Sequence, residues 1–186
     1  MSKTTKTISP LWEIIAHDEK RLTGVLFIAS ALVILTALAS QYIGGLQPCA
    51  LCLDQRLPYY IGVPILALIY LSPVQYAKYG LLIIGCIFVY SAGFGFYHAG
   101  VEYGFWAGPS ACSQASASVP LTIDDLNRSL SSEAIIRCDA AAFTLFGISL
   151  AGYNFIASAG VALVALLGSR RFWRTQPTKT KTPKTN

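Results

Sequence analysis

Residues 22–42 read LTGVLFIASALVILTALASQY, and these 21 residues include no charged side chain. A membrane-spanning helix needs about 20 mostly apolar residues, since each residue adds about 1.5 Å and the hydrocarbon core is about 30 Å thick. This stretch therefore predicts a transmembrane helix.

Three further apolar runs, at about 50–71, 79–97 and 144–167, have the same character. The second reaches spanning length if its helix begins near Cys49, with its first two turns at the membrane surface. We therefore expect an all-α membrane protein. It would be a bundle of four transmembrane helices forming one integral membrane domain over residues 1–186.

The composition agrees with a membrane protein. Only 12% of the residues are charged, whereas a soluble domain carries about 25%. This excludes an ordinary water-soluble domain and a disordered charged tail. The net charge of +5 would suggest nucleic acid only if the basic residues formed a stripe, and they do not. No nucleic-acid partner is expected.

The distribution of basic residues predicts how the helices are oriented in the membrane. Four spans place both termini on one side, and two loops, at about 43–56 and 98–143, on the other. Only Arg56, Arg128 and Arg137 lie in those two loops. The other eleven lie at the termini and in the short middle loop: Lys3, Lys6, Lys20, Arg21, Lys78, Arg170, Arg171, Arg174, Lys179, Lys181 and Lys184. The positive-inside rule therefore predicts cytoplasmic termini.

Both ends of the chain carry a further expectation. Ala37-Leu38-Ala39 resembles a signal-peptide cleavage site, but the acidic residues before the apolar run and the length of that run favour a retained first span. The tail at about 175–186 is rich in Thr, Lys and Pro, which predicts a disordered cytoplasmic end.

The five cysteines are placed unevenly. Cys49 and Cys52 form a Cys-x-x-Cys in the first outer loop, Cys112 and Cys138 lie in the second, and Cys86 lies within the third span. Cys86 is expected to be a small apolar residue of the bundle. The other four face one compartment, which is the oxidising periplasm if the membrane is a bacterial inner membrane.

Three interpretations of the outer four cysteines remain open. Structural disulfides would explain Cys112 and Cys138, but a bridge between residues three apart constrains almost nothing. A tetrahedral metal site usually has paired short spacings, and only one exists here. A redox relay needs one short-loop pair that opens and closes and a second pair that exchanges with it, and the sequence supplies both.

The residues around the Cys-x-x-Cys favour redox chemistry. Pro48 precedes Cys49 as if opening a helix, and the positive end of a helix favours a thiolate. Cys49, Cys52 and Arg56 would form one helical stripe. Arg56 would then stand at the edge of the hydrocarbon, where a charge is costly and usually functional. The alternative is an arginine that extends to the interface.

His98 and Glu102 stand four residues apart at the outer end of the third span. His98 is placed to donate a hydrogen bond to a carbonyl at the membrane edge. An interfacial histidine paired with Glu102 is the alternative.

These motifs resemble the DsbB family of bacterial inner-membrane disulfide oxidoreductases. The residues concerned are Gln47-Pro48-Cys49-Ala50-Leu51-Cys52 with Arg56, Tyr97-His98-Ala99-Gly100-Val101-Glu102, and Cys138-Asp139 followed by Phe146-Gly147-Ile148-Ser149-Leu150. The resemblance runs from Leu22 to about Leu167. At Phe143 the chain departs from many relatives, which have Trp there.

The resemblance implies an enzyme that reoxidises DsbA, a periplasmic thioredoxin-fold dithiol oxidase, and passes the electrons to ubiquinone or menaquinone. It implies four catalytic cysteines, Cys49, Cys52, Cys112 and Cys138, with Cys112 bonded to Cys138. Arg56 and His98 would hold the quinone oxygens, and no metal is implied. One alternative with the same chemistry is a paralogue that oxidises a dedicated dithiol partner. Two alternatives of a different class are a non-enzymatic membrane scaffold held by disulfides and a metal-handling membrane protein.

Overall fold

The computed structural model describes residues 19–109, 123 and 138–175. Predictions for Cys112, for most of the second outer loop and for the tail beyond residue 175 lie outside these residues. The elements in chain order are α2 (Glu19–Tyr42), α3 (Ala50–Asp54), α4 (Leu57–Leu71), the 3₁₀ turn η1 (Val74–Tyr76), α5 (Ala77–Glu102), β1 (Thr144–Leu145), β2 (Ile148–Ser149) and α8 (Leu150–Thr175).

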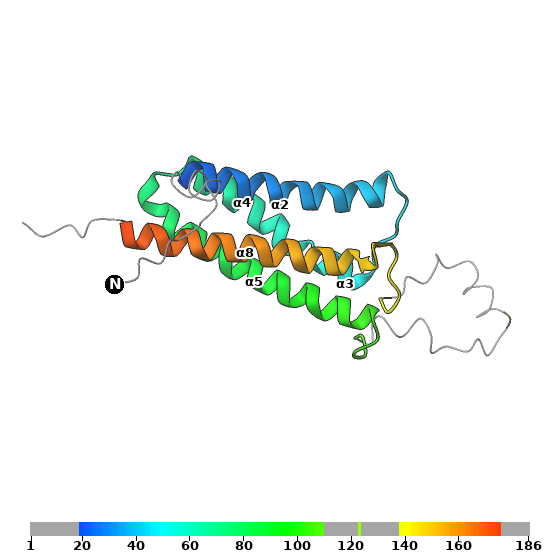
Figure 1. Ribbon diagram of the computed structural model, residues 1–186. Coiled ribbons are helices and arrows are strands. Elements are labelled where there is room, and N and C mark those ends of the chain that lie inside the picture. The colour runs from blue at the N-terminus through cyan, green and yellow to red at the C-terminus, as the bar shows by residue number, and fades with distance from the viewer. Residues whose placement is uncertain (1–18, 110–122, 124–137, 176–186) are drawn as a thin grey trace, which may run out of the picture.

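The helices lie side by side as an elongated bundle, with α5 packed along α8 and α2 packed on α4 (Figure 1). One end of the bundle holds the start of α2, the connection from α4 to α5 and the end of α8. The opposite end, here called the cysteine end, holds residues 43–49, α3, the last turn of α5 and the β1–β2 hairpin. The prediction of a helical membrane protein is confirmed.

Among the residues that the structure describes, three helical segments are long and apolar enough to cross a membrane: Glu19–Tyr42, Val74–Glu102 and Leu150–Arg174. α4, the expected second span, has 15 residues and would be about 22 Å long. It is thus short for a span by itself, and the fourth crossing stays a prediction.

The second apolar run forms two helices instead of one. α3 ends at Asp54, and α4 starts at Leu57 with Pro58 in its first turn. A proline has no N–H to donate to the carbonyl four residues earlier, which here belongs to Asp54. The helical ladder therefore cannot pass unbroken from α3 into α4, and Arg56 lies at the break.

The fourth helix begins later than its apolar run. Residues 144–149 form a two-stranded antiparallel hairpin in which Thr144 pairs with Ser149 and Leu145 with Ile148. Phe146 and Gly147, at the turn, have φ angles of 50° and 79°. Such left-handed backbone does not continue a right-handed helix, so α8 starts at Leu150.

A core of apolar side chains fills the centre of the bundle. Leu22 of α2, Leu66 of α4, and Leu81 and Phe88 of α5 are fully buried. Tyr59 meets Phe88 edge to face at 5.1 Å between ring centroids. Large apolar side chains also cover the outside. Among them are Val25, Ile28, Leu32, Leu35, Leu68, Ile83, Val89 and Leu163. An apolar outer surface is what lipid contact requires.

Gly95 sets the distance between α5 and α8. A Cβ atom at this position would lie 3.0 Å from the backbone nitrogen of Phe155 and 3.1 Å from its Cα. Gly93, two residues earlier on α5, would meet nothing within 4 Å. Small residues at a helix contact allow such a close backbone approach.

The end opposite the cysteines carries most of the described basic residues. Lys78 lies over the rings of Tyr79 and Trp173, at 5.2 and 4.7 Å from their centroids, and Ser169 donates a hydrogen bond to the Lys78 carbonyl. This end also holds Lys20, Arg21, Arg170, Arg171 and Arg174. Charged and aromatic side chains gather in this way where a bundle leaves the membrane.

Candidate functional site

Cys49 begins the short helix that carries Cys52. Its sulfur accepts a hydrogen bond from the backbone N–H of Cys52 at 3.1 Å, so Cys49 is the N-cap residue of α3. Both cysteines are free thiols, with Cys49 buried and Cys52 partly buried. The Cys-x-x-Cys therefore occupies a helix start, as the sequence predicts.

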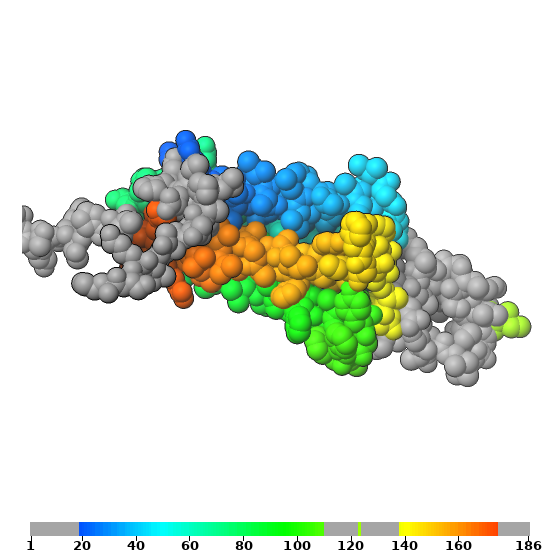
Figure 2. Space-filling view, viewed as in Figure 1, coloured from blue at the N-terminus to red at the C-terminus, as the bar shows by residue number. Residues whose placement is uncertain are grey.

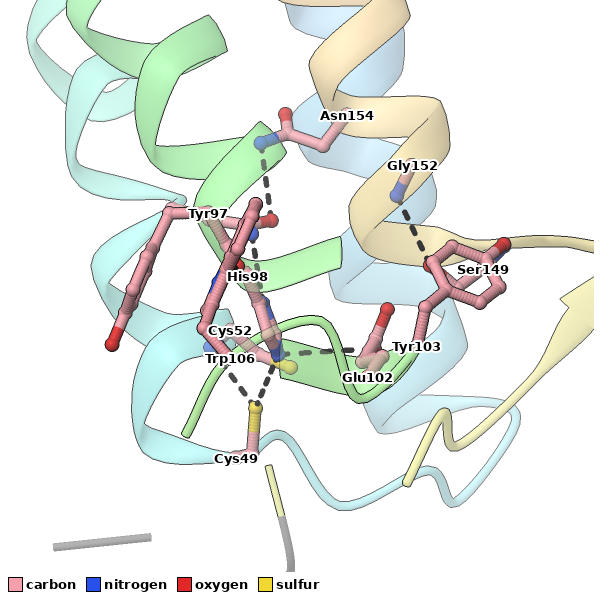
Figure 3. A network of polar contacts seen from close by, with 11 residues as sticks. Cys49, Cys52, Tyr97, His98, Glu102, Tyr103, Trp106, Ser149, Gly152 and Asn154 are labelled. Carbon is pink, nitrogen blue, oxygen red and sulfur yellow. Dashed lines mark hydrogen bonds and ion pairs between the residues drawn. The ribbon is translucent and has the colours of Figure 1, made fainter. Parts of the chain in front are cut away.

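His98 lies against this pair from the last turns of α5 (Figure 3). Its Nε2 atom is 3.6 Å from the Cys49 Sγ and 3.8 Å from a carboxylate oxygen of Glu102. The Sγ atoms of Cys49 and Cys52 and one ring nitrogen of His98 all lie within 4.8 Å of one another. The C-terminal end of α5 and the Cys-x-x-Cys thus form one site.

A chain of side-chain hydrogen bonds runs from His98 into the bundle. The His98 Nδ1 is 2.8 Å from the Gln55 amide nitrogen, and Asn154 donates to the Gln55 oxygen at 3.1 Å. Ser158 donates to Asn154 and shares hydrogen bonds with Tyr59 and Ser91: 2.8 Å to the Tyr59 hydroxyl and 2.9 Å to the Ser91 hydroxyl. This network fixes the orientation of the imidazole ring.

A cavity of about 420 Å³ opens beside Cys52, between α2, α3, α4 and α8. Its wall is mainly apolar, with Leu32, Ala37 and Leu150 among the residues that line it, and Cys49, Cys52, Arg56 and Glu102 also line it. Arg56 donates hydrogen bonds to the Gln41 side chain and to the Ala37 carbonyl, the latter at 3.2 Å. This mainly apolar space with the Arg56 guanidinium on its wall suits an apolar ligand that carries a polar oxygen.

Cys138 lies in a small buried cluster with Cys49 and Leu51, against which Phe94 and Tyr97 pack. Cys138 takes part in a disulfide bond. Its expected partner, Cys112, lies outside the described residues. Cys86, on α5, is an exposed free thiol and belongs to none of these contacts.

Two hydrogen bonds hold the hairpin to Tyr103, the residue that follows α5. The Tyr103 hydroxyl donates to the Gly147 carbonyl at 2.9 Å and accepts from the Ser149 N–H at 3.3 Å. Figure 2 shows the yellow hairpin segment covering the cysteine end between the cyan residues after α2 and the green end of α5. Trp106 closes the same end, since it donates to the Tyr97 carbonyl at 2.8 Å and stacks on the Tyr97 ring.

The two thiols of the pair differ in acidity. The hydrogen bond between the two sulfurs raises the pKa of the Cys49 thiol, with burial adding to the rise. The same hydrogen bond lowers the pKa of Cys52. Cys52, which lines the cavity, is therefore the sulfur that ionises first, and Cys49 holds the shared proton.

The structure brings together most of the predicted site residues. Cys49, Cys52, His98 and Cys138 form contiguous contacts, and Arg56 lies on the cavity wall. His98 is not among the residues that line the cavity, so it meets the pair from the side of Cys49 and Gln55.

Sequence reasoning missed Gln41, Gln55 and Asn154. A signal existed for Asn154 and Ser158: two polar residues four positions apart in an otherwise apolar run usually face a bundle interior.

Comparison with known proteins assigns the family. The family model described as "Disulfide bond formation protein DsbB" matches residues 19–168. An uncharacterized protein, RP370, of Rickettsia prowazekii (strain Madrid E) is 31% identical over 156 residues, which cover 83% of this chain and 88% of that protein. No solved structure matches the chain. Because the family model matches residues 19–168, a stretch that includes the Cys-x-x-Cys site, the chain belongs to the DsbB family of disulfide bond formation proteins.

Proposed function

We propose that this protein oxidises a periplasmic dithiol partner, a DsbA-like thioredoxin-fold oxidase, and passes the electrons to a membrane quinone. Membership of the DsbB family makes it a multi-pass membrane disulfide oxidoreductase. One observation carries the finer proposal. Cys138, which is disulfide-bonded, lies in the same buried cluster as Cys49 of the free pair.

The proposed relay uses both pairs. A thiolate of the partner attacks the Cys112–Cys138 disulfide at Cys112 and releases Cys138 as a thiolate. Cys138 attacks the Cys49–Cys52 disulfide at Cys49, so that the electron pair of the broken bond leaves on Cys52. The lowered pKa of Cys52 suits a leaving group, because a thiol of lower pKa leaves faster.

The cavity beside Cys52 fits a quinone ring and the start of its tail. When bound, the quinone supplies the oxidant, since it accepts the two electrons and two protons of a dithiol. Arg56 would donate to a ring oxygen, and Gln41 and Ala37 already hold its guanidinium in place. The second donor is proposed to be His98; its position behind Cys49 suggests that Arg56 contributes more to quinone binding. The apolar wall excludes water from the sulfurs.

The proposed orientation places the cysteine end in the periplasm and both termini in the cytoplasm of a bacterial inner membrane. The basic residues at the opposite end support it, because short cytoplasmic segments carry an excess of Lys and Arg. In the oxidising periplasm the Cys112–Cys138 bond can be re-formed and maintained.

A direct assay tests this function. Purified protein is mixed with ubiquinone and reduced DsbA, and the quinone absorbance is followed. We expect quinone reduction by the wild type and by Cys86→Ser, and none by Cys49→Ala or Cys52→Ala. Equal rates with and without Cys52 would overturn the proposal. Cys138→Ser should accumulate a partner adduct on Cys112, and an adduct on Cys49 would reverse the proposed order.

A scaffold stapled by disulfides would keep its bonds when mixed with reduced DsbA. A dedicated paralogue would leave DsbA reduced and oxidise a different periplasmic dithiol. The same assay, repeated with other thioredoxin-fold partners, separates these two alternatives.

A further inference from the structure

The hydrogen bond between Gln55 and His98 fixes the position of the imidazole proton. The Gln55 side-chain nitrogen lies 2.8 Å from the His98 Nδ1. An amide nitrogen only donates hydrogen bonds, so Nδ1 accepts and carries no proton. A charged imidazole would donate from both ring nitrogens, which would place two donors face to face here. The ring is therefore neutral, with its one proton on Nε2.

The orientation of the Gln55 amide is set from α8. Asn154 donates from its side-chain nitrogen to the Gln55 oxygen at 3.1 Å, which leaves the Gln55 nitrogen for His98. The Asn154 oxygen in turn accepts from the Ser158 hydroxyl at 3.4 Å. Since a hydroxyl has one proton, Ser158 accepts from the two other hydroxyls that it contacts. Each bond thus fixes the direction of the next, from the middle of the bundle to the imidazole.

The proton on Nε2 faces the sulfur of Cys49. The His98 Nε2 lies 3.6 Å from the Cys49 Sγ, a hydrogen-bond distance for a sulfur acceptor, and Figure 3 shows this contact as a dashed line. The Glu102 carboxylate, at 3.8 Å from Nε2, is beyond the length of an N–H···O hydrogen bond. His98 is 1% exposed and Cys49 is 5% exposed, so bulk water does not compete for this bond.

We propose that Asn154 and Gln55 are positioning residues that hold His98 in the tautomer with a protonated Nε2, so that His98 donates to the Cys49 sulfur and stabilises its thiolate. The other tautomer would present a lone pair to that sulfur instead. The same tautomer is the one that a quinone oxygen would require, because Nε2 is the ring nitrogen that Gln55 leaves free.

The role of this donor in turnover rests on the relay proposed above, in which Cys138 becomes bonded to Cys49. Cys112 is released as a thiolate when the partner closes its own disulfide. It then attacks Cys138, so that the Cys112–Cys138 bond forms, the Cys138–Cys49 bond breaks and the electron pair leaves on Cys49. A donated N–H stabilises the departing thiolate, because hydrogen bonds to charged acceptors are the stronger ones.

The tautomer can be observed directly, because His17 and His98 are the two histidines of the chain. The full-length protein with His17→Gln is labelled with ¹⁵N-histidine, reduced and studied in detergent without quinone or partner. The nitrogen chemical shifts and the one-bond N–H coupling report which ring nitrogen carries the proton. The spectra are recorded at slightly alkaline pH, where an ordinary imidazole is neutral.

We expect a proton on Nε2 and none on Nδ1 of His98. Gln55→Glu should bring a proton to Nδ1, because a carboxylate only accepts. Asn154→Asp should do the same from two bonds away, since Gln55 must then turn its nitrogen toward the new carboxylate and its oxygen toward His98. Gln75→Glu makes the same change as Gln55→Glu at an exposed position of η1, and this control should leave the tautomer unchanged.

A proton on Nδ1 of the reference protein would overturn the proposal, and so would an Nδ1 that stays unprotonated in both Gln55→Glu and Asn154→Asp. Helical circular dichroism shows that each variant is folded. The reference spectrum decides the tautomer even if one of the variants does not fold.

A second measurement tests the bond from His98 to Cys49. Cys49 is made the only thiol by replacing the other four cysteines with serine, and its alkylation rate is followed against pH. His98→Leu should move this curve to higher pH by about one unit or more, because the thiolate loses a hydrogen bond. His98→Gln keeps a side-chain N–H and should move the curve less.

Equal curves for the reference protein and His98→Leu would overturn the donation to Cys49. Neither measurement includes a quinone or a partner, so failure here leaves the proposed function untouched. Conversely, a protein with the expected tautomer that does not reduce quinone in the presence of reduced DsbA would contradict the proposed function alone.

Discussion

Asn154 donates a hydrogen bond of 3.1 Å to the side-chain oxygen of Gln55, across 99 residues of sequence. This bond joins α8 to the break between α3 and α4 and lies two bonds away from the Cys49 sulfur. The redox pair is therefore supported from the middle of the bundle as well as from its own helix.

Replacing Asn154 by Leu should destabilise the protein by about 1–2 kcal/mol, because it leaves the buried Gln55 oxygen without its donor. Thermal unfolding in detergent, followed by circular dichroism, measures this loss. Leu163→Ala, at an exposed position of the same helix, is the control and should change the melting temperature little. Equal melting temperatures for Asn154→Leu and the wild type would contradict the prediction.

Gly95→Ala and Gly93→Ala should have opposite effects. At Gly95 the new methyl group meets the α8 backbone at Phe155, and forcing two packed backbones apart costs about 1–3 kcal/mol. At Gly93 the methyl group enters open space, and alanine favours a helix over glycine by about 1 kcal/mol. The same unfolding measurement compares them, and a Gly95→Ala variant as stable as Gly93→Ala would show that α5 and α8 are not so close.

Arg56→Ala should raise the KM for quinone by roughly 10–100-fold, because a hydrogen bond to a charged group contributes about 1.5–3 kcal/mol. Gln41→Leu should raise KM less, since Arg56 keeps its bond to the Ala37 carbonyl. Steady-state kinetics with varied quinone concentration gives both values. In this assay an unchanged KM in Arg56→Ala would remove Arg56 from the quinone site.

Cys52 should be alkylated ahead of Cys49 at neutral pH. The lowered pKa of Cys52 increases its thiolate fraction below pH 9, whereas the raised pKa of Cys49 keeps that thiol protonated. Cys49→Ala removes the hydrogen bond between the sulfurs and should shift the rate–pH curve of Cys52 to higher pH, while Cys49→Ser retains a donor and should shift it less. Mass spectrometry of iodoacetamide-treated protein reads the rates. Identical curves for the two variants would contradict this cause of the shift.

Cys86→Ser should leave both stability and thiol oxidation close to wild type. Cys86 is exposed on α5 and lies outside the cluster of Cys49 and Cys138. The turnover assay with reduced DsbA measures this, with Cys52→Ser as the inactive comparison. A large loss of turnover in Cys86→Ser would give this thiol a role that its position does not suggest.

The long apolar helices were predictable, because an uncharged run of about 20 residues is typical of a membrane-spanning helix. The predicted first span, 22–42, lies within α2, Glu19–Tyr42. The predicted single helix over 50–71 was wrong in one respect, because Pro58 interrupts the ladder and creates α3 and α4. Arg56 is consequently at the break and not on a continuous stripe with the cysteines, although it still shares the cavity wall with Cys52.

Contacts between distant elements were harder to predict. Local rules place Cys49 at a helix start and His98 at the end of a span, but they cannot say which face of α8 turns toward α3. The link from Gln55 to Asn154 depends on how the helices pack, and so does the position of Glu102 beside His98. The disulfide partner of Cys138 and the quinone-binding roles of Arg56 and His98 stay predictions.

The two hydrogen bonds by which Tyr103 holds the hairpin have a kinetic consequence for Cys138. Cys138 is six residues before β1, so the chain between them spans at most about 20 Å when fully extended. Once released from its own disulfide, Cys138 therefore stays within reach of Cys49 at an effective concentration of order millimolar or more. In the proposed relay, the exchange between the two pairs would thus proceed at a rate independent of how much protein the membrane holds.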